Sequence, residues 1–285
     1  MRIWLALAAV VAALHAPLAC ADRDTLSGAP LPPRPPEKTS PIHDRFYVLA
    51  AFYSPTIQTN VRVDPTNPVV PGTLGTPVSG EQDLGLAPRM HQGRVEFMFR
   101  MRDRHKLRVE YYEADRSGNQ VLANDIVFGN QTFLAGQTVQ SEVDWRSFGL
   151  TYTYSFIRTD SLEIGTGLGV FALQAYALGA IPATGQAQSE SAAEPLPTLP
   201  LDLTWAISRR FALTGRANYL KARISGVDGS FLDVHGDLQY RWNSSFAIGL
   251  GYTAMHISLD DKSGNPPGMV SLHFNGPEAF VRFSF

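Results

Sequence analysis

The chain has 285 residues, of which 44% are hydrophobic and 18% charged, and its formal net charge is -2 at pH 7. This composition is too polar for a bundle of membrane helices and too apolar for a disordered chain. The near-neutral charge argues against nucleic acid as the main partner, and a single Cys excludes a disulfide framework and a multi-Cys zinc site.

The first 21 residues have the layout of a secretory signal peptide. Met1 and Arg2 form a short positive start, an apolar run follows over 3–14, and small residues end at Ala21. We expect cleavage after Ala21. The alternative is a bacterial lipoprotein, because the segment that ends at Cys20 is similar to a lipobox, in which that Cys is lipidated. Residues 22–43 are rich in Pro, which predicts an extended periplasmic linker.

Residues 44–285 alternate between apolar and polar side chains with a period of two, clearly so in 94–102 and 147–156. Successive side chains of a β-strand point to opposite faces, so each segment has one apolar and one polar face. We expect ten strands, with eight or twelve as alternatives if two strands have been merged or split. The expected strands are 45–54, 91–102, 105–115, 140–157, 160–176, 196–207, 210–224, 230–242, 245–259 and 270–285.

Several of these strands exceed the usual length of about five or six residues, and short turns alternate with longer connections. Long strands joined in this way are typical of an outer-membrane β-barrel with both termini on the periplasmic side. The predicted fold class is all-β, a closed antiparallel transmembrane barrel over 44–285. Pro197 and Pro200 are interpreted as the loop-proximal start of the sixth strand. The longer connections are expected near 55–90, 116–139, 177–195, 225–230 and 260–269.

The polar face of these strands is predicted to line a narrow lumen, because ten strands enclose little space. Arg guanidinium groups can pair there with carboxylates on neighbouring strands. Two interpretations stay open: a charge-paired plug, or a narrow path that conducts or holds a small molecule. The predicted lumen network comprises Arg94, Glu96, Arg100, Arg102, Arg108, Glu110, Asp202, Arg216, Asp233, His235, Asp237, Arg241 and Arg282, and Glu163 is also predicted to point inward.

The last ten residues place apolar side chains at alternate positions and finish on Phe, with Phe280, Val281, Phe283 and Phe285 as a predicted assembly signal. This end resembles the C-terminal strand signal that outer-membrane barrels present to the barrel assembly machinery. The segment 81–86 and the architecture over 44–285 resemble small OmpW-like outer-membrane barrels, which usually have eight strands. The resemblance implies a protein of the cell outer membrane of a Gram-negative bacterium.

Lipid and lipopolysaccharide are the expected partners in that membrane. Arg binds phosphate with two parallel hydrogen bonds, so loop-proximal arginines are candidates for contacts with lipopolysaccharide phosphates. The candidates are Arg62, Arg89, Arg116 and Arg223.

We expect no enzyme, no cofactor and no metal site, since the seven His are scattered and no catalytic motif is recognisable. One alternative is a surface hydrolase similar to the omptin proteases, which also have ten strands. In that case His256 with Asp260 and Asp261, joined by Asp83, would activate a water molecule as a general base. The other alternative is a soluble secreted β-barrel that binds an apolar ligand.

Overall fold

The computed structural model describes residues 40–66, 73–224, 227–262, 264 and 266–285. The predicted signal peptide and most of the predicted linker lie outside these residues. The last part of that linker is folded, because Pro41–His43 form a 3₁₀ helix, η1, with Ser40 as its N-cap. Ile42 in this helix is fully buried. Within the described residues, no helix is long and apolar enough to cross a membrane.

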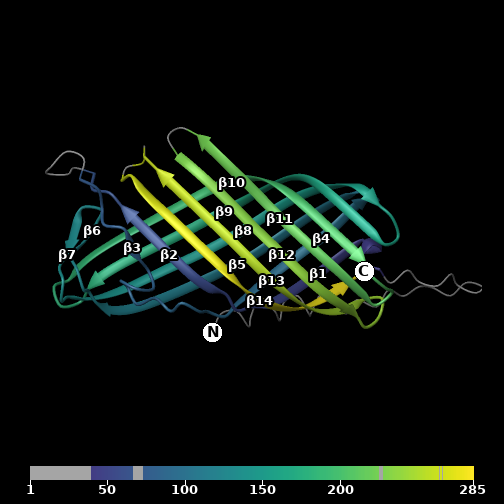
Figure 1. Ribbon diagram of the computed structural model, residues 1–285, viewed down its shortest axis with the longest axis horizontal. Helices are drawn as coiled ribbons and strands as arrows, with labels where there is room; N and C mark the ends of the chain where they lie inside the picture. Colours follow the sequence, from purple (N-terminus) through teal and green to yellow (C-terminus); the bar gives the residue numbers. More distant parts are fainter. Residues whose placement is uncertain (1–39, 67–72, 225–226, 263, 265) are drawn as a thin grey trace, which may run out of the picture. The chain divides into compact units, whose positions relative to one another are not determined.

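Ten wall strands form a closed antiparallel β-barrel (Figure 1), as predicted. Each wall strand pairs with the next one in chain order, and β14 closes the barrel by pairing with β1 and β2. β1 and β2 are two parts of the first wall strand, interrupted at Ser54 and Pro55, and β3 (Val78–Ser79) is a short addition to β2. The wall consists of β1 (Phe46–Tyr53) with β2 (Thr56–Val63), β4 (Gln92–Arg102), β5 (His105–Val121), β8 (Thr138–Arg158), β9 (Leu162–Ile181), β10 (Gln186–Ala206), β11 (Phe211–Ile224), β12 (Val227–Arg241), β13 (Phe246–Asp261) and β14 (Gly268–Ser284).

Several wall strands, β5, β8, β9 and β10 among them, are longer than the sequence pattern predicts. Most of the connection expected over 177–195 is wall, because β9 runs to Ile181 and β10 begins at Gln186. Pro197 and Pro200 therefore lie well inside β10 and not at its start, which corrects the interpretation made from the sequence. The connection expected over 116–139 contains the end of β5, the beginning of β8 and a small hairpin. That hairpin consists of β6 (Ile126–Phe128) and β7 (Gln131–Phe133).

The two ends of the barrel differ. At one end, which we call the terminal end, the short turns lie beside the start of β1 and the end of β14. At the other, which we call the loop end, the longer connections lie together with β3, β6 and β7, on the left of Figure 1. The turns at the terminal end are 103–104, 159–161, 207–210 and 242–245.

The polarity of both wall faces reverses partway along the strands, as β8 illustrates. From the terminal end up to Phe148 its outward side chains are apolar, but the next outward ones are Arg146 and Asp144. Its inward side chains are Ser and Thr up to Ser147 and are then mostly apolar, beginning with the buried Trp145. Toward the loop end the strand therefore has the polarity of a soluble barrel, and toward the terminal end the inverse.

Neighbouring strands reverse at the same level. In β5 the outward Tyr111, which is paired with Phe148 of β8, is followed by the outward Glu113. In β11 the outward Tyr219 is followed by Lys221. The reversal thus follows the wall from strand to strand, and we call its level the polarity boundary.

A belt of exposed apolar side chains covers the outer face between the polarity boundary and the terminal end. Leu250 of β13 is 71% exposed, and Trp242, directly after β12, is 68% exposed. In the predicted assembly signal, Val281, Phe283 and Phe285 belong to this belt, whereas Phe280 is buried inside the barrel. Other members of the belt are Phe99, Tyr111, Phe148, Leu150, Tyr152, Tyr154, Phe156, Leu168, Val170, Leu201, Trp205, Phe211, Leu213, Tyr219, Leu232, Leu238, Ile248 and Tyr252.

Candidate functional site

The mouth at the terminal end is closed by ion pairs to one carboxylate. Asp44 directly follows η1, and its side chain is 7% exposed. Its oxygens accept hydrogen bonds from Arg241 at 3.0 and 2.6 Å and from Arg282 at 2.6 Å. The Arg282 guanidinium also stacks on the ring of Tyr47, 3.7 Å from its centroid. The segment before the first strand is therefore tied to β12 and β14 as a floor across the lumen.

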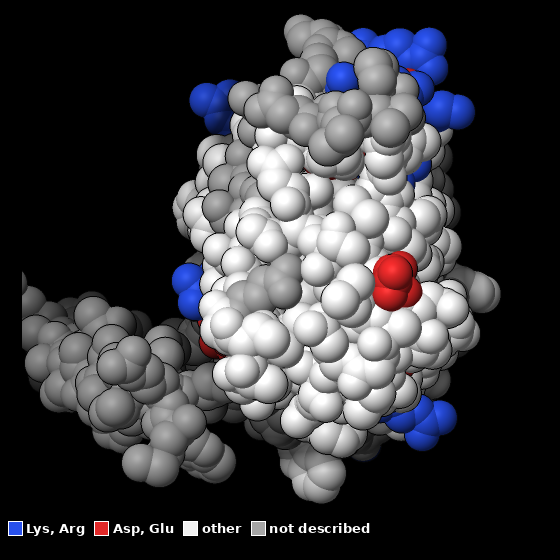
Figure 2. Space-filling view, turned by 90° about the vertical axis from the view of Figure 1, so that its left-hand side faces the viewer, with Lys and Arg blue, Asp and Glu red and all other residues white. Residues whose placement is uncertain are grey.

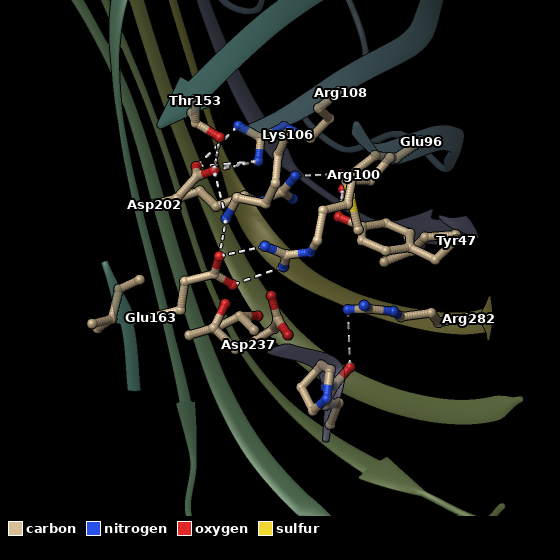
Figure 3. Close-up of a pocket in the computed structure, with 18 of the residues that line it drawn as sticks. Tyr47, Glu96, Arg100, Lys106, Arg108, Thr153, Glu163, Asp202, Asp237 and Arg282 are labelled. Carbon is tan, nitrogen blue, oxygen red and sulfur yellow. Dashed lines mark hydrogen bonds and ion pairs between the residues drawn. The ribbon is translucent and has the colours of Figure 1, made fainter. Parts of the chain in front are cut away.

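A second group of ion pairs lies next to this floor (Figure 3). Arg100 of β4 donates two hydrogen bonds to Glu163 of β9, at 2.8 and 3.0 Å. Arg108 of β5 donates to both oxygens of Asp202 in β10, at 3.1 and 3.2 Å to Oδ1 and at 3.3 Å to Oδ2. Lys106 joins the two pairs, because its Nζ lies 3.7 Å from Glu163 and 3.6 Å from Asp202. These contacts connect strands that are not neighbours in the wall, so they cross the lumen.

Glu96 of β4 is the centre of a third group. The hydroxyl of Tyr47 donates to Glu96 at 2.5 Å, and Arg216 of β11 forms an ion pair with the same carboxylate. Arg94 lies 3.4 Å from Glu96 and donates two hydrogen bonds to Glu278 of β14, at 3.1 and 3.0 Å. Charges of both signs therefore alternate across the width of the barrel at this level.

Two further acidic side chains extend the network toward the polarity boundary. Glu110 of β5 lies 3.9 Å from both Arg94 and Arg216. On β12, Asp233 lies 2.9 Å from Nε2 of His235, and both side chains are buried. The network thus reaches from the terminal end to the boundary.

Ion pairs with this degree of burial leave little room for solvent. Burial of an ion costs several kcal/mol unless partners replace its water, and here the partners are other side chains. A cavity of about 50 Å³ lies between them, lined among others by Asp237 and Gln239. It can hold only a few water molecules. At this level the lumen is filled by side chains.

All predicted lumen residues except Arg102 are buried or nearly buried. Each of them belongs to this network or lines the small cavity. Arg102, the last residue of β4, is exposed, because the register between β4 and β5 shifts between Arg100 and Arg102. Such a shift moves a side chain to the other face of the sheet. The prediction of an inward Arg102 was therefore wrong.

Four network members were not predicted from the sequence: Asp44, Tyr47, Lys106 and Glu278. Lys106 and Glu278 occupy inward positions of the same alternation as Arg108 and its neighbours, so the period of two could have identified them. Asp44 precedes the first strand and has no such signal in the sequence.

On the loop-end side of the polarity boundary, a layer of apolar side chains fills the lumen. Phe171 of β9 contacts Phe231 of β12, with ring centroids 5.0 Å apart, and Trp145 of β8 lies 6.2 Å from Phe274 of β14. Both contacts join strands that are not neighbours, so they cross the barrel. We call this layer the apolar plug. It comprises Ile57, Tyr112, Ala114, Trp145, Phe171, Leu173, Leu196, Phe231, Met255, Ile257, Leu272 and Phe274.

A cavity of about 700 Å³ lies on the loop-end side of the apolar plug, and we call it the upper cavity. Its lining is predominantly apolar and includes Val61, Trp145 and Phe274. Two basic side chains reach it, and each has an acidic partner: Arg62 pairs with Asp64 at 3.0 Å, and Arg116 with Glu81 at 2.6 Å. Figure 2 shows that the loop end is largely uncharged on the visible face, with basic groups near its margin.

The arginines proposed to meet lipopolysaccharide lie in different places. Arg116 is buried inside the barrel, where it cannot contact a lipid headgroup, which corrects that assignment. Arg89 and Arg223 are exposed, and Arg223 forms an ion pair with Asp228 beyond the polarity boundary. The hydrogen bond from Arg223 lowers the pKa of the Asp228 carboxyl below its ordinary value.

Of the residues named for the hydrolase alternative, His256 and Asp260 lie on the outer face of β13, whereas Asp261 lines the upper cavity. Met255 and Ile257 belong to the apolar plug, so His256 between them points to the outer face, where its ring lies 4.1 Å from that of His273. Asp260 is paired with Lys262 at 3.5 Å, and the described residues contain no group of His, Cys, Asp and Glu able to hold a metal ion.

No protein-family model matches the sequence, and no curated protein matches it. Solved structures do match by shape. The outer membrane protease OmpT from Escherichia coli matches with a TM-score of 0.55 at 10% identity, over 84% of this chain and 97% of that one. The transport unit of the autotransporter AIDA-I from Escherichia coli matches at 9% identity over 90% and 92%, with a TM-score of 0.39. Ail of Yersinia pestis matches at 8% identity over 83% and 99%, with a TM-score of 0.36. The chain thus has the fold of an outer-membrane β-barrel, here with ten wall strands.

Proposed function

We propose that this protein is a non-catalytic barrel of the outer membrane of a Gram-negative bacterium. In this proposal the lumen does not conduct, and the upper cavity binds an apolar small molecule. The membrane placement is supported by the apolar belt, which would expose a large hydrophobic surface to water in a soluble secreted barrel. It also agrees with the sequence resemblance to a signal peptide and to a C-terminal assembly signal. Whether the protein is OmpW-like remains a prediction, and its ten strands differ from the eight of that group.

Two layers of side chains, one after the other, close the lumen and support the proposal that it does not conduct. The floor at Asp44 and the ion pairs next to it fill the half near the terminal end, and the apolar plug fills the next layer. An ion that crossed would have to displace paired side chains and then enter an apolar layer, which costs several kcal/mol without replacement ligands.

The upper cavity is the observation that carries the binding proposal. Its volume of about 700 Å³ falls within the range of about 300–1,000 Å³ that is usual for small-molecule sites. Such sites are mostly apolar with few polar groups, as is the lining here. The acidic partners of Arg62 and Arg116 leave those cations little capacity for a charged ligand.

The experiment measures ligand binding and conductance on the same refolded protein. A bromoalkane in the upper cavity is expected to quench the fluorescence of Trp145, which lines it. Ala175→Phe should reduce this quenching, because Ala175 lines the cavity, whereas Ala172→Phe on the outer face of the same strand should not. Planar bilayers with the protein are expected to stay silent. Resolvable conductance steps would overturn the closed-lumen proposal, and identical quenching in both variants would overturn the binding site.

A further inference from the structure

The backbone pairing between β10 and β11, which we call the seam, ends partway along the wall. The two strands pair from Ala206 and Ala212 up to Leu199 and Tyr219, although both continue toward the loop end. Within the described residues, 195–198 of β10 have no partner on β11, whereas they stay paired with β9. β11 likewise stays paired with β12. β10 and β11 are therefore not paired with each other beyond Leu199 and Tyr219, and we call this unpaired stretch of the wall the opening.

Proline explains why the seam ends there. Successive residues of an antiparallel strand direct their N–H groups alternately to the two neighbouring strands. The ladder between β9 and β10 continues past Pro195 and Pro197, so the N–H groups that these residues lack are those that would face β11. The N–H group that Pro200 lacks would face β9 instead, and the ladder with β9 is interrupted there, between Thr198 and Leu201. β10 thus cannot donate two of the hydrogen bonds that would extend the seam.

The upper cavity lies directly behind this opening. Pro195, Leu196 and Pro197 of β10 line it, and so do Leu220 and Ala222 of β11. The unpaired stretch of wall is therefore also part of the wall of an apolar cavity.

Between β2 and β5, a loop covers the place that corresponds to this opening. There Glu81 accepts a hydrogen bond from the backbone N–H of Thr59 in β2 and pairs with Arg116 in β5. The loop before β4 thereby bridges these two strands, so the opening at β10 and β11 lacks a counterpart on that side.

The opening begins at the polarity boundary. Tyr219 is the last outward aromatic of β11, and Lys221 follows it on the outer face. Backbone groups without partners cannot lie in hydrocarbon, but at the edge of the apolar layer they can meet water or headgroups. The opening is thus at the height where a lipid chain and its headgroup meet.

We propose that this opening is a lateral portal through which a fatty acid passes between the outer leaflet and the upper cavity. The acyl chain lies in the cavity, and the carboxylate lies beside Lys221. Lys221 is exposed and makes no salt bridge within the described part of the chain, whereas its neighbour Arg223 is paired with Asp228. The proposal rests on the proposed function, because it supplies the route and the ligand class for that cavity.

The test uses Trp145 as the reporter, with Trp4, Trp205 and Trp242 replaced by Phe and the lone Cys20 replaced by Ser. The protein is reconstituted in vesicles, and dibromostearic acid is added as the quencher. A Pro195→Cys, Arg223→Cys variant, which keeps Lys221, is compared before and after cross-linking with a short bis-thiol reagent.

Cross-linking across the portal is expected to slow the quenching of Trp145 about tenfold, as expected when access requires an opening step. The matched control is Leu201→Cys with Ala217→Cys, two positions already opposite each other in the paired seam, where the same cross-link should change nothing. Quenching that is equally fast before and after closure of the portal would overturn the portal but leave the cavity standing. No quenching in any variant, with bromoalkane included, would overturn the proposed function itself.

Two further measurements test the ligand class. Lys221→Gln should weaken binding of dibromostearic acid about tenfold relative to a bromoalkane, since a charge-assisted contact to a carboxylate is lost. An unchanged ratio would overturn the place given to the carboxylate. Vesicles made of a phospholipid with brominated chains should quench Trp145 only weakly. Strong quenching by that lipid would identify a membrane phospholipid as the occupant and overturn the fatty acid.

Discussion

Removal of the Asp44 carboxylate is expected to destabilise the barrel strongly. Asp44→Ala leaves the buried guanidinium groups of Arg241 and Arg282 without the carboxylate that they share, and three hydrogen bonds of 2.6 to 3.0 Å are lost. Breaking a buried ion pair by removing one partner costs about 3–5 kcal/mol. Arg241 keeps a hydrogen bond to the Ser244 carbonyl at 2.8 Å, and Arg282 keeps its contact with Tyr47. We therefore expect a loss near the lower limit, about 3 kcal/mol.

The measurement is urea unfolding of the refolded protein in lipid vesicles, followed by Trp fluorescence. With a urea dependence of about 1–3 kcal/mol per M, the midpoint should fall by about 1–3 M. The control is Asp103→Ala, whose side chain is 90% exposed and lies 3.9 Å from Arg158, and it should change the free energy of unfolding by less than about 0.5 kcal/mol. Equal losses in the two variants, or a loss for Asp44→Ala below about 1 kcal/mol, would refute the role of the floor.

Three other outcomes are expected. Phe231→Ala should lower the free energy of unfolding by about 3–5 kcal/mol, because it leaves a void in the apolar plug. Leu232→Ala, on the lipid side, should lower it much less, and urea unfolding measures both variants. Asp228 should titrate below the ordinary Asp value of about 3.9. Its contribution to stability is therefore present above that pH and is lost as the pH falls through the lowered pKa. Arg223→Gln should return the pKa of Asp228, measured by NMR titration, toward about 3.9. Deletion of Phe285 should reduce insertion into the outer membrane, and normal yield in a membrane fraction would count against the assembly signal.

The strand count and the inward face of the wall could be predicted because a period of two is a local property of the sequence. Two successive residues of a strand face opposite sides wherever the pairing is regular, so Arg108 and Glu110 could be assigned without knowledge of their partners. Arg102 shows the limit of this reasoning. The register shift that turns it outward depends on how β4 meets β5, and the alternation in β4 alone carries no sign of it. Asp44 lies outside any strand, and its place is set by the arginines that it binds.

The extent of β10 could not be predicted for a different reason. Pro lowers the expectation of a strand because it cannot donate to a ladder, and β10 contains Pro195, Pro197 and Pro200. The strand forms nevertheless, because two of the missing donors face a side where no partner is paired. The prolines that weaken the prediction of a strand are thus the residues that end the pairing with β11. The place where the sequence pattern fails to predict the strand therefore marks a candidate functional feature.

The polarity boundary makes the closed lumen and the open seam parts of one arrangement. Toward the terminal end the outer face must be apolar to meet lipid, so the polar side chains of an alternating strand can only point inward, where they need partners and fill the lumen with ion pairs. Toward the loop end the outer face meets water, and the alternation places apolar side chains inside, as with Trp145 behind Arg146. An apolar cavity is therefore possible only on that side of the boundary. A ligand that dissolves in the membrane must enter such a cavity where the apolar belt and the apolar interior come closest, and that is the level at which β10 and β11 part, beyond Leu199 and Tyr219.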